Sequence, residues 1–499
     1  MQVRLNKEKL RDKIYACWIG KNIGGTMGGP YEGKREMQDI RGFATAKGEP
    51  LPNDDLDLQL IWLTAMEQIG PHALTANTLG DYWVSYIPPH WHEYGIGKSN
   101  LKVGLMPPLS GEFHNESWKN SNGAWIRSEI WACLAPGFPN IAVKYAYMDA
   151  SIDHGVSEGT FAEIFTAAME SMAFVETDLR VVIKKALGFI PEDCRIARSV
   201  KLVLTEYDKK TPWQEVRRML VEQSADIGWF QAPANIGYVV LGLIYGEGDF
   251  KKSMILSINC GDDTDCTGAT CGAIMGILYG TAGIPKDWAE YIGDRIITVA
   301  VDASYSLVPK TCTELTERVM ELIPSVLKAH GHFSRLHHGV YMEYTDGEDS
   351  YDKEAAFNVQ YGNYGNFLPE FSIDLLKELM AYGPYYFEVT NGCHLSAAVQ
   401  YETAPEVQPL TDFKVKVHFR NHRPDAHHME LTVALPEGWT ADYRRSVYLE
   451  HGSMNTHNRA TWEMTIHVGE QVYAVNRVSV WVSASTHPLP LMIPMVLMG

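Results

Sequence analysis

The spacing of apolar residues changes once along this chain of 499 residues, and this change limits the fold more than any other feature. Before about residue 330, apolar residues recur at positions i, i+3, i+4 and i+7, as on one face of a helix. After residue 385, apolar and polar residues alternate, as along a half-buried strand. The sequence therefore predicts an all-α domain followed by a small all-β domain, an immunoglobulin-like antiparallel sandwich.

The clearest helical segments are residues 55–69, 160–175, 212–227 and 313–329, and the clearest strands are residues 412–421, 429–439, 459–468 and 476–485. We expect an all-α domain over residues 1–335, an irregular connection over 336–384 and the sandwich over 385–499. Residues 86–122 lack a period and are rich in Pro, Gly and aromatic residues. That composition predicts a long loop placed to cover a substrate.

The chain carries a formal net charge of −18, from 43 Lys+Arg and 61 Asp+Glu, without a basic block. Because a phosphate backbone is repelled by such a surface, nucleic acid is disfavoured as the main ligand. No apolar run near the N-terminus has the length of a secretion signal, so we expect a cytoplasmic protein. The apolar segment 488–499 is too short to cross a bilayer and predicts an edge strand, with no membrane partner. The oligomeric state stays open.

The segment INCGDDTDCTGATCGAIMGILYG, residues 258–280, places Asp262, Asp263 and Asp265 directly before a helix of small and apolar residues. One aspartate is enough to cap a helix, whose N-terminal partial positive charge favours an anion. Three within four residues repel one another, by about 4 kcal/mol per pair at about 4 Å and an effective dielectric near ~20. A bound cation therefore explains the cluster better than capping does.

A second acidic group, Asp54, Asp55 and Asp57, lies in the first turn of the earliest predicted amphipathic helix. Taken alone, this group is typical of helix capping. Together the two clusters supply hard oxygen ligands, whereas the His and Cys residues show no regular zinc-ligand spacing. The combination suits one or two ions of Mg²⁺, Mn²⁺ or Ca²⁺ far better than zinc.

The glycine-rich segment IGKNIGGTMGGPYEG, residues 19–33, lacks the signatures of a P-loop and of a dinucleotide-binding turn. Two interpretations stay open. The segment is either a flexible turn or a loop that lets the backbone approach a ligand and presents Glu32 at its end.

Five segments together resemble the ADP-ribosylglycohydrolase family, in the same order and at similar distances, over residues 8 to about 330. They are GGTMGGPYEG at 24–33, NDD at 53–55, SNGAWIR at 121–127, DHGVSEG at 153–159 and NCGDDTDCTGATCGAIMGILYG at 259–280. The resemblance implies an all-α catalytic domain, an orthogonal helical bundle, that binds Mg²⁺, usually as a pair. It also implies hydrolysis of a ribosyl glycosidic bond.

The resemblance also assigns roles to individual residues. The implied metal ligands are Asn53, Asp54, Asp55, Asp263, Asp265 and Cys266. The implied substrate-binding residues are Ser121, Asn122 and Gly123, on a loop that holds phosphate or ribose, and His154. The candidate catalytic residues are Glu32, Asp54 and Asp263, of which Glu32 or an aspartate would deprotonate the attacking water.

The chain departs from the family at several of these positions. Threonines are usual where Asn53, Leu56 and Cys266 stand, a glycine where Asp262 stands and an aspartate where Gly25 stands. Three functions therefore stay open. The chain is a metal-dependent hydrolase of ADP-ribosylated substrates, a glycosidase or nucleoside hydrolase acting on another small-molecule ribosyl or furanosyl glycoside, or a catalytically inactive ligand-binding protein of the same fold.

Overall fold

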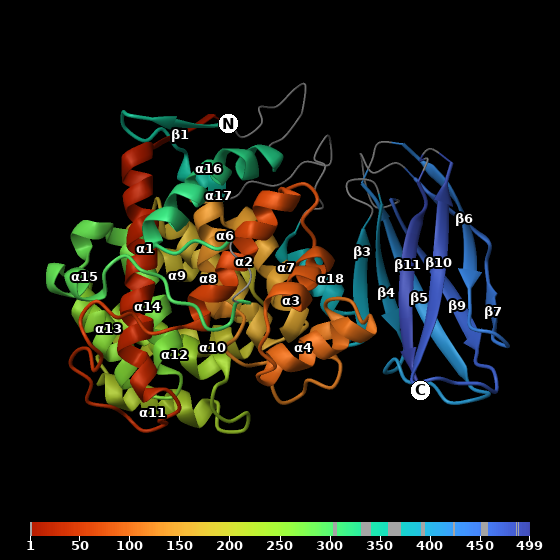
Figure 1. Ribbon diagram of the computed structural model, residues 1–499, viewed down its shortest axis with the longest axis horizontal. Helices are drawn as coiled ribbons and strands as arrows, with labels where there is room; N and C mark the ends of the chain where they lie inside the picture. The colour runs from red at the N-terminus through yellow and green to blue at the C-terminus, as the bar shows by residue number, and fades with distance from the viewer. Residues whose placement is uncertain are drawn as a thin grey trace.

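The computed structural model describes residues 2–302, 307–330, 341–357, 371–390, 395–422, 425–450, 458–485, 487 and 489–499. A domain of helices and a domain of strands lie side by side, on the left and right of Figure 1. Helices dominate the described chain up to residue 329, and strands dominate it after residue 385. The predicted change from an all-α to an all-β domain is confirmed.

The helices of the first domain are α1 (Lys7–Gly28), α2 (Asp54–Ile69), α3 (Ala76–Tyr86), α4 (His92–Val103), α5 (Leu109–Glu112), α6 (Glu129–Leu134), α7 (Pro139–His154), α8 (Glu158–Ala173), α9 (Leu179–Ala186), α10 (Arg195–Asp208), α11 (Trp213–Gln223), α12 (Ala232–Gly246), α13 (Phe250–Asn259), α14 (Thr264–Tyr279), α15 (Lys286–Ile292) and α16 (Cys312–Ala329). Short 3-10 helices include η1 (Gly29–Tyr31) and η2 (Trp125–Arg127). The four predicted helical segments correspond to α2, α8, α11 and α16. None of the helices that the structure describes is long and apolar enough to cross a lipid bilayer.

Helices α1 and α14 pack against each other through glycines on both helices. A Cβ atom on Gly24 would lie 2.0 Å from the carbonyl oxygen of Gly268, and one on Gly20 would lie 2.1 Å from that of Gly272. The two helices run antiparallel, so the end of α1 lies against the start of α14. Both interpretations of residues 19–33 are therefore wrong for residues 19–28, which form the last part of helix α1. The glycines are needed there because only glycine, which has no Cβ atom, permits this close approach of the two helices.

Residues 86–122 do not form one long loop, because they contain α4 and α5. The buried face of helix α4 includes the polar residues Glu93, Lys98 and Asn100. Because these residues are polar, the helix does not show the regular spacing of apolar residues from which helices are predicted. The amide nitrogen of Asn100 donates to the carbonyls of Ser110 and Phe113 at 2.8 and 2.7 Å, which fixes the chain after the helix. The segment is therefore packed into the helical domain and is not the long covering loop that the sequence predicted.

Strands β3 to β11 form two antiparallel sheets. They are β3 (Tyr386–Thr390), β4 (Leu395–Tyr401), β5 (Asp412–Asn421), β6 (His427–Ala434), β7 (Thr440–Tyr443), β8 (Ser446–Leu449), β9 (Arg459–His467), β10 (Val475–Ala484) and β11 (Leu491–Met498). The sheet orders are β3-β4-β5-β9-β7 and β11-β10-β6-β8, so β11 is the predicted edge strand. Inward-facing residues of both sheets, such as Val417 of β5 and Val480 of β10, share one apolar core.

The described part of residues 336–384 holds three regular elements: β2 (Tyr341–Thr345), α17 (Lys353–Phe357) and α18 (Ile373–Met380). Strand β2 pairs in parallel with β1 (Gln2–Asn6), which precedes α1. The chain therefore returns to the start of the helical domain before it enters the sandwich.

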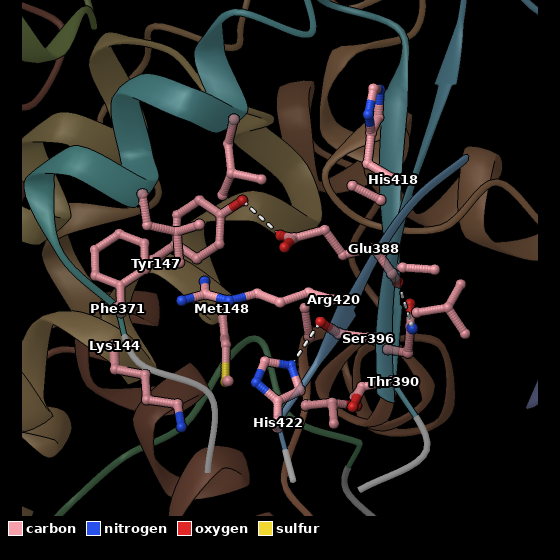
Figure 2. Close-up of a pocket in the computed structure, with 18 of the residues that line it drawn as sticks. Lys144, Tyr147, Met148, Phe371, Glu388, Thr390, Ser396, His418, Arg420 and His422 are labelled. Carbon is pink, nitrogen blue, oxygen red and sulfur yellow. Dashed lines mark hydrogen bonds between the residues drawn. The ribbon is translucent and has the colours of Figure 1, made fainter. Parts of the chain in front are cut away.

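The segment that follows α4 joins the two domains. Leu105, Leu109 and Phe113 are buried in the core of the sandwich rather than in that of the helices. The backbone N–H of Glu388, in β3, donates to the carbonyl of Pro107 at 3.2 Å. A cavity of about 150 Å³ lies beside this contact, and Figure 2 shows Glu388 in it, accepting a hydrogen bond of 2.7 Å from the hydroxyl of Tyr147, in α7.

We predict that Gly24→Ala lowers the free energy of unfolding of the helical domain by about 2–3 kcal/mol, because its methyl group would overlap the backbone of α14. Denaturant titration followed by circular dichroism measures the change. Gly42→Ala is the matched control, since a Cβ at Gly42 meets no atom within 4 Å. Equal stability of the two variants would contradict the close glycine contact.

Candidate active site

The two acidic segments of the sequence meet where α2 and α14 begin. Ligand atoms of Glu32, Asp263 and Asp265 lie within 4.8 Å of one another. Those of Asp55, Asp265 and Cys266 form a second group within the same limit. Because Asp265 belongs to both groups, the residues offer adjoining places for two cations.

Three buried carboxylate oxygens in this cluster lack a hydrogen-bond donor. Asp55 Oδ2, Asp263 Oδ1 and Asp265 Oδ1 accept no hydrogen bond from any residue that the structure describes. A buried ionised oxygen without a partner is costly, and a hard divalent cation is the ligand that relieves this cost. The residues present therefore fit Mg²⁺ or a similar ion.

Glu32 and Asp54 complete the cluster on the side of the cavity. Glu32 is exposed, whereas Asp263 and Asp265 are buried. The charge of Asp265 is the largest cause that raises the pKa of Glu32 to about 8, and the charge of Asp54 and the partial removal of the Glu32 carboxyl group from water add to it. Burial and then the charge of Asp265 raise the pKa of Asp54 to about 6, although the Tyr94 hydroxyl donates to its Oδ2 at 2.9 Å.

The protein supplies little positive charge to the deeper part of the cluster. Burial is the largest cause that raises the pKa of Asp55, Asp263 and Asp265 above the ordinary range. The buried ammonium of Lys21 opposes the shift of Asp55, but Lys21 is itself paired with Glu129 at 2.8 Å. The cluster therefore holds more buried negative charge than its protein surroundings balance.

The remaining aspartates of the two segments have other partners. Asp57 Oδ2 accepts from the backbone N–H groups of Val299 and Ala300 at 2.5 and 2.6 Å. Asp262 Oδ1 accepts from the backbone N–H of Phe230 at 2.9 Å. These two aspartates hold neighbouring chain segments beside the cavity, so only part of each acidic triplet joins the cluster.

Two departures from the family pattern meet in space. Asn53 Oδ1 accepts from the backbone N–H of Asp55 at 2.8 Å and so caps α2. A Cβ atom on Gly25 would lie 2.2 Å from Asn53 Nδ2. Gly25 therefore makes the room that the amide of Asn53 needs, and the two replacements compensate for each other.

Cys266 contributes a donor to the same cluster. Its Sγ donates to Asp55 Oδ1 at 3.3 Å. Burial and the nearby aspartates raise the pKa of the Cys266 thiol well above its usual range. Without a bound ion, these surroundings favour the thiol over the thiolate.

The loop before η2 reaches the acidic cluster through Asn122, whose Nδ2 donates to Asp263 Oδ2 at 2.7 Å. Ser121 Oγ lies 3.1 Å from His154 Nε2, and His154 Nδ1 lies 2.8 Å from Asp153 Oδ1. His154 is fully buried, and it does not belong to the residues that line the cavity. Arg127, in η2, donates to the carbonyl of Gly123 and fixes this loop.

A cavity of about 390 Å³ opens above the cluster. Its lining includes the acidic residues Glu32, Asp54, Asp263 and Asp265 together with Trp91, His92, Glu93, Tyr94, Trp118, Ser121, Asn122, Gly123 and Phe230. The rings of His92 and Trp118 stack with centroids 3.9 Å apart. Residues 91–94 were not among the predicted site residues, although their aromatic composition within the segment expected to cover the substrate was a signal.

Glu93 is a buried acidic residue in the lining of the cavity, and it was not among the predicted site residues. It lies in the first turn of α4, and burial raises its pKa to about 7. A Cβ atom on Gly123 would lie 2.2 Å from Glu93 Oε1, and the same oxygen lies 4.0 Å from His154 Nε2. Glu93 therefore fills the space directly beside the loop that begins at Ser121.

Comparison with known proteins shows which family the helical domain matches. The family model described as ADP-ribosylglycohydrolase matches residues 6–322. The chain is 36% identical over 62 residues to an ADP-ribosylarginine hydrolase Tri1 of Pseudomonas putida (strain GB-1), covering 11% of this chain and 17% of the relative. It is 34% identical over 77 residues to the protein of the same name from Serratia proteamaculans (strain 568), covering 14% and 21%. These matches span about a fifth of the relatives' length.

A solved structure described as an ADP-ribosylglycohydrolase-related protein complex aligns with 64% of this chain and 99% of its own, at 18% identity and a TM-score of 0.44. The family model alone covers more than half of the chain, over the same residues that form the helical domain and its acidic cluster. The chain therefore belongs to the ADP-ribosylglycohydrolase family.

Proposed function

We propose that this protein is a divalent-metal-dependent hydrolase that cleaves the glycosidic bond of a ribosyl or other furanosyl group. One observation carries the proposal: two groups of possible metal ligands share Asp265, and three of their buried carboxylate oxygens have no donor among the residues that the structure describes. Membership of the family and the names of the two curated relatives support a bond to a ribosyl group.

The two groups divide the ligands between two ions. Asp263 and Asp265 would hold one, and Asp55 and Asp265 the other, with Asp54 beside them. Glu32, the third member of the first group, would stay free of both ions. When bound, Mg²⁺ would orient the vicinal hydroxyls of the sugar and polarise the attacking water.

Glu32 is placed to act as the base, because it is the exposed carboxylate of its group and faces the cavity. In the proposed step it takes a proton from a water whose oxygen bonds to the anomeric carbon. The bond from that carbon to the leaving group breaks, and the leaving group departs with the electron pair and gains a proton from solvent. The surrounding carboxylates, among them Asp54, stabilise the positive charge that develops on the sugar.

We predict that Asp265→Asn abolishes binding of both divalent ions, because Asp265 is common to the two groups. Titration calorimetry with Mg²⁺ and Mn²⁺ measures this loss. The ion-free variant should also melt at a higher temperature than the ion-free native chain, since one buried charge is removed from a repelling cluster.

Asp262→Asn is the matched control for that experiment. Asp262 lies in the same segment but bonds to the backbone of Phe230, so its variant should bind ions as the native protein does. Native protein that takes up neither ion would rule out a metal-dependent hydrolase and favour a catalytically inactive binding protein.

We predict that Glu32→Gln lowers kcat about 100- to 10,000-fold, because a positioned general base contributes this much. The assay measures hydrolysis of ADP-ribosyl-arginine, nucleosides and nitrophenyl furanosides in the presence of Mg²⁺. Glu36→Gln, in the exposed chain just after Glu32, should retain native rates. Undiminished activity of Glu32→Gln would remove Glu32 from its assigned role.

A further inference from the structure

The lining of the 390 Å³ cavity contains no lysine or arginine among the residues that the structure describes. Its charged residues are Glu32, Asp54, Glu93, Asp263 and Asp265. A diphosphate carries two negative charges and needs cations or free N–H donors where it binds. Outside the cluster that would hold the metal ions, the described cavity wall offers a diphosphate no cationic side chain.

The loop that the family resemblance assigns to phosphate or ribose is also engaged by the protein itself. Asn122 Nδ2 donates to Asp263, and Ser121 Oγ lies within hydrogen-bond distance of His154. The carbonyl of Gly123 accepts from Arg127. The side chains of Ser121 and Asn122 are therefore already paired within the protein.

Glu93 occupies the space beside that loop. Its carboxyl oxygen lies so close to Gly123 that a Cβ atom there would come within 2.2 Å of it. The side chain is 9% exposed, and helix α4 holds its backbone in place. A phosphate on this side of the sugar would have to displace Glu93 or lie against a second negative group.

We propose that the cavity binds a ribosyl or other furanosyl glycoside that carries no phosphate, and that Glu93 is the specificity-determining residue that excludes phosphate. The proposal rests on the hydrolase function proposed above and names its substrate class. Glu93 would accept a hydrogen bond from a sugar hydroxyl, and the stacked rings of His92 and Trp118 would contact an uncharged face of the substrate.

The test compares p-nitrophenyl ribofuranoside with its 5-phosphate, as both anomers, with Mg²⁺ at pH 8, where the Glu93 carboxyl is charged. We expect the native protein to favour the unphosphorylated compound by about 100-fold in kcat/KM. Glu93→Gln should reduce this ratio about tenfold or more, because it removes the charge and keeps the size. The ratio is measured within one variant, so a general loss of activity cancels.

Glu112→Gln is the matched control, since Glu112 is a buried glutamate that pairs with Lys119 outside the cavity. Its ratio should equal that of the native protein. Mg²⁺ binding and circular dichroism confirm that each variant is folded.

The outcomes separate the two proposals. Hydrolysis of the 5-phosphate or of ADP-ribosyl-arginine at least as efficiently as of the unphosphorylated compound overturns the substrate class and leaves the hydrolase standing. An unchanged ratio in Glu93→Gln overturns the role of Glu93. Without any turnover the hydrolase fails, and calorimetry with ribose and ribose 5-phosphate still decides whether phosphate is excluded: tighter binding of the phosphate overturns the inference.

Discussion

The contact between α1 and α14 is the constraint on which the candidate site depends. Gly20 and Gly24 let the two backbones approach until the addition of a single Cβ atom would cause overlap. Glu32 follows α1 directly through η1, and Asp265 lies in the first turn of α14. The antiparallel contact therefore sets the distance between these two carboxylates. A larger residue in place of Gly20 or Gly24 would push the helices, and with them the carboxylates, apart.

The acidic residues around this contact fall into two physical kinds. Asp57 and Asp262 accept backbone hydrogen bonds from Val299 and Phe230, so they hold these segments beside the cavity. Asp55, Asp263 and Asp265, like Asp57, each keep a buried oxygen without a donor among the residues that the structure describes. What separates the two kinds is therefore position: of these aspartates, Asp55, Asp263 and Asp265 belong to the groups whose ligand atoms lie within 4.8 Å of one another, and this grouping marks the place for a cation.

Helix α4 connects the site to the second domain. Its first turn supplies Glu93 and Tyr94 to the cavity, and the chain that follows it buries Leu105 and Phe113 in the core of the sandwich. The wall of the cavity and the anchor of the β domain are therefore one continuous segment. This arrangement explains why residues 86–122 are ordered, and it places Glu93 on a supported helix rather than on a free loop.

The sequence by itself determined the change from helices to strands and the acidic character of the two helix starts, because both are local patterns of residue type. Only the tertiary structure decided which aspartates join, since the partners of Asp57 and of Asp265 lie more than 200 residues away in the chain. It also decided that residues 19–28 are helical and that Glu93 enters the cavity. A glycine-rich segment by itself predicts a turn, and here it forms a helix that packs against a second helix far away in the sequence. A buried glutamate is polar, so it does not contribute to the apolar spacing from which burial is predicted.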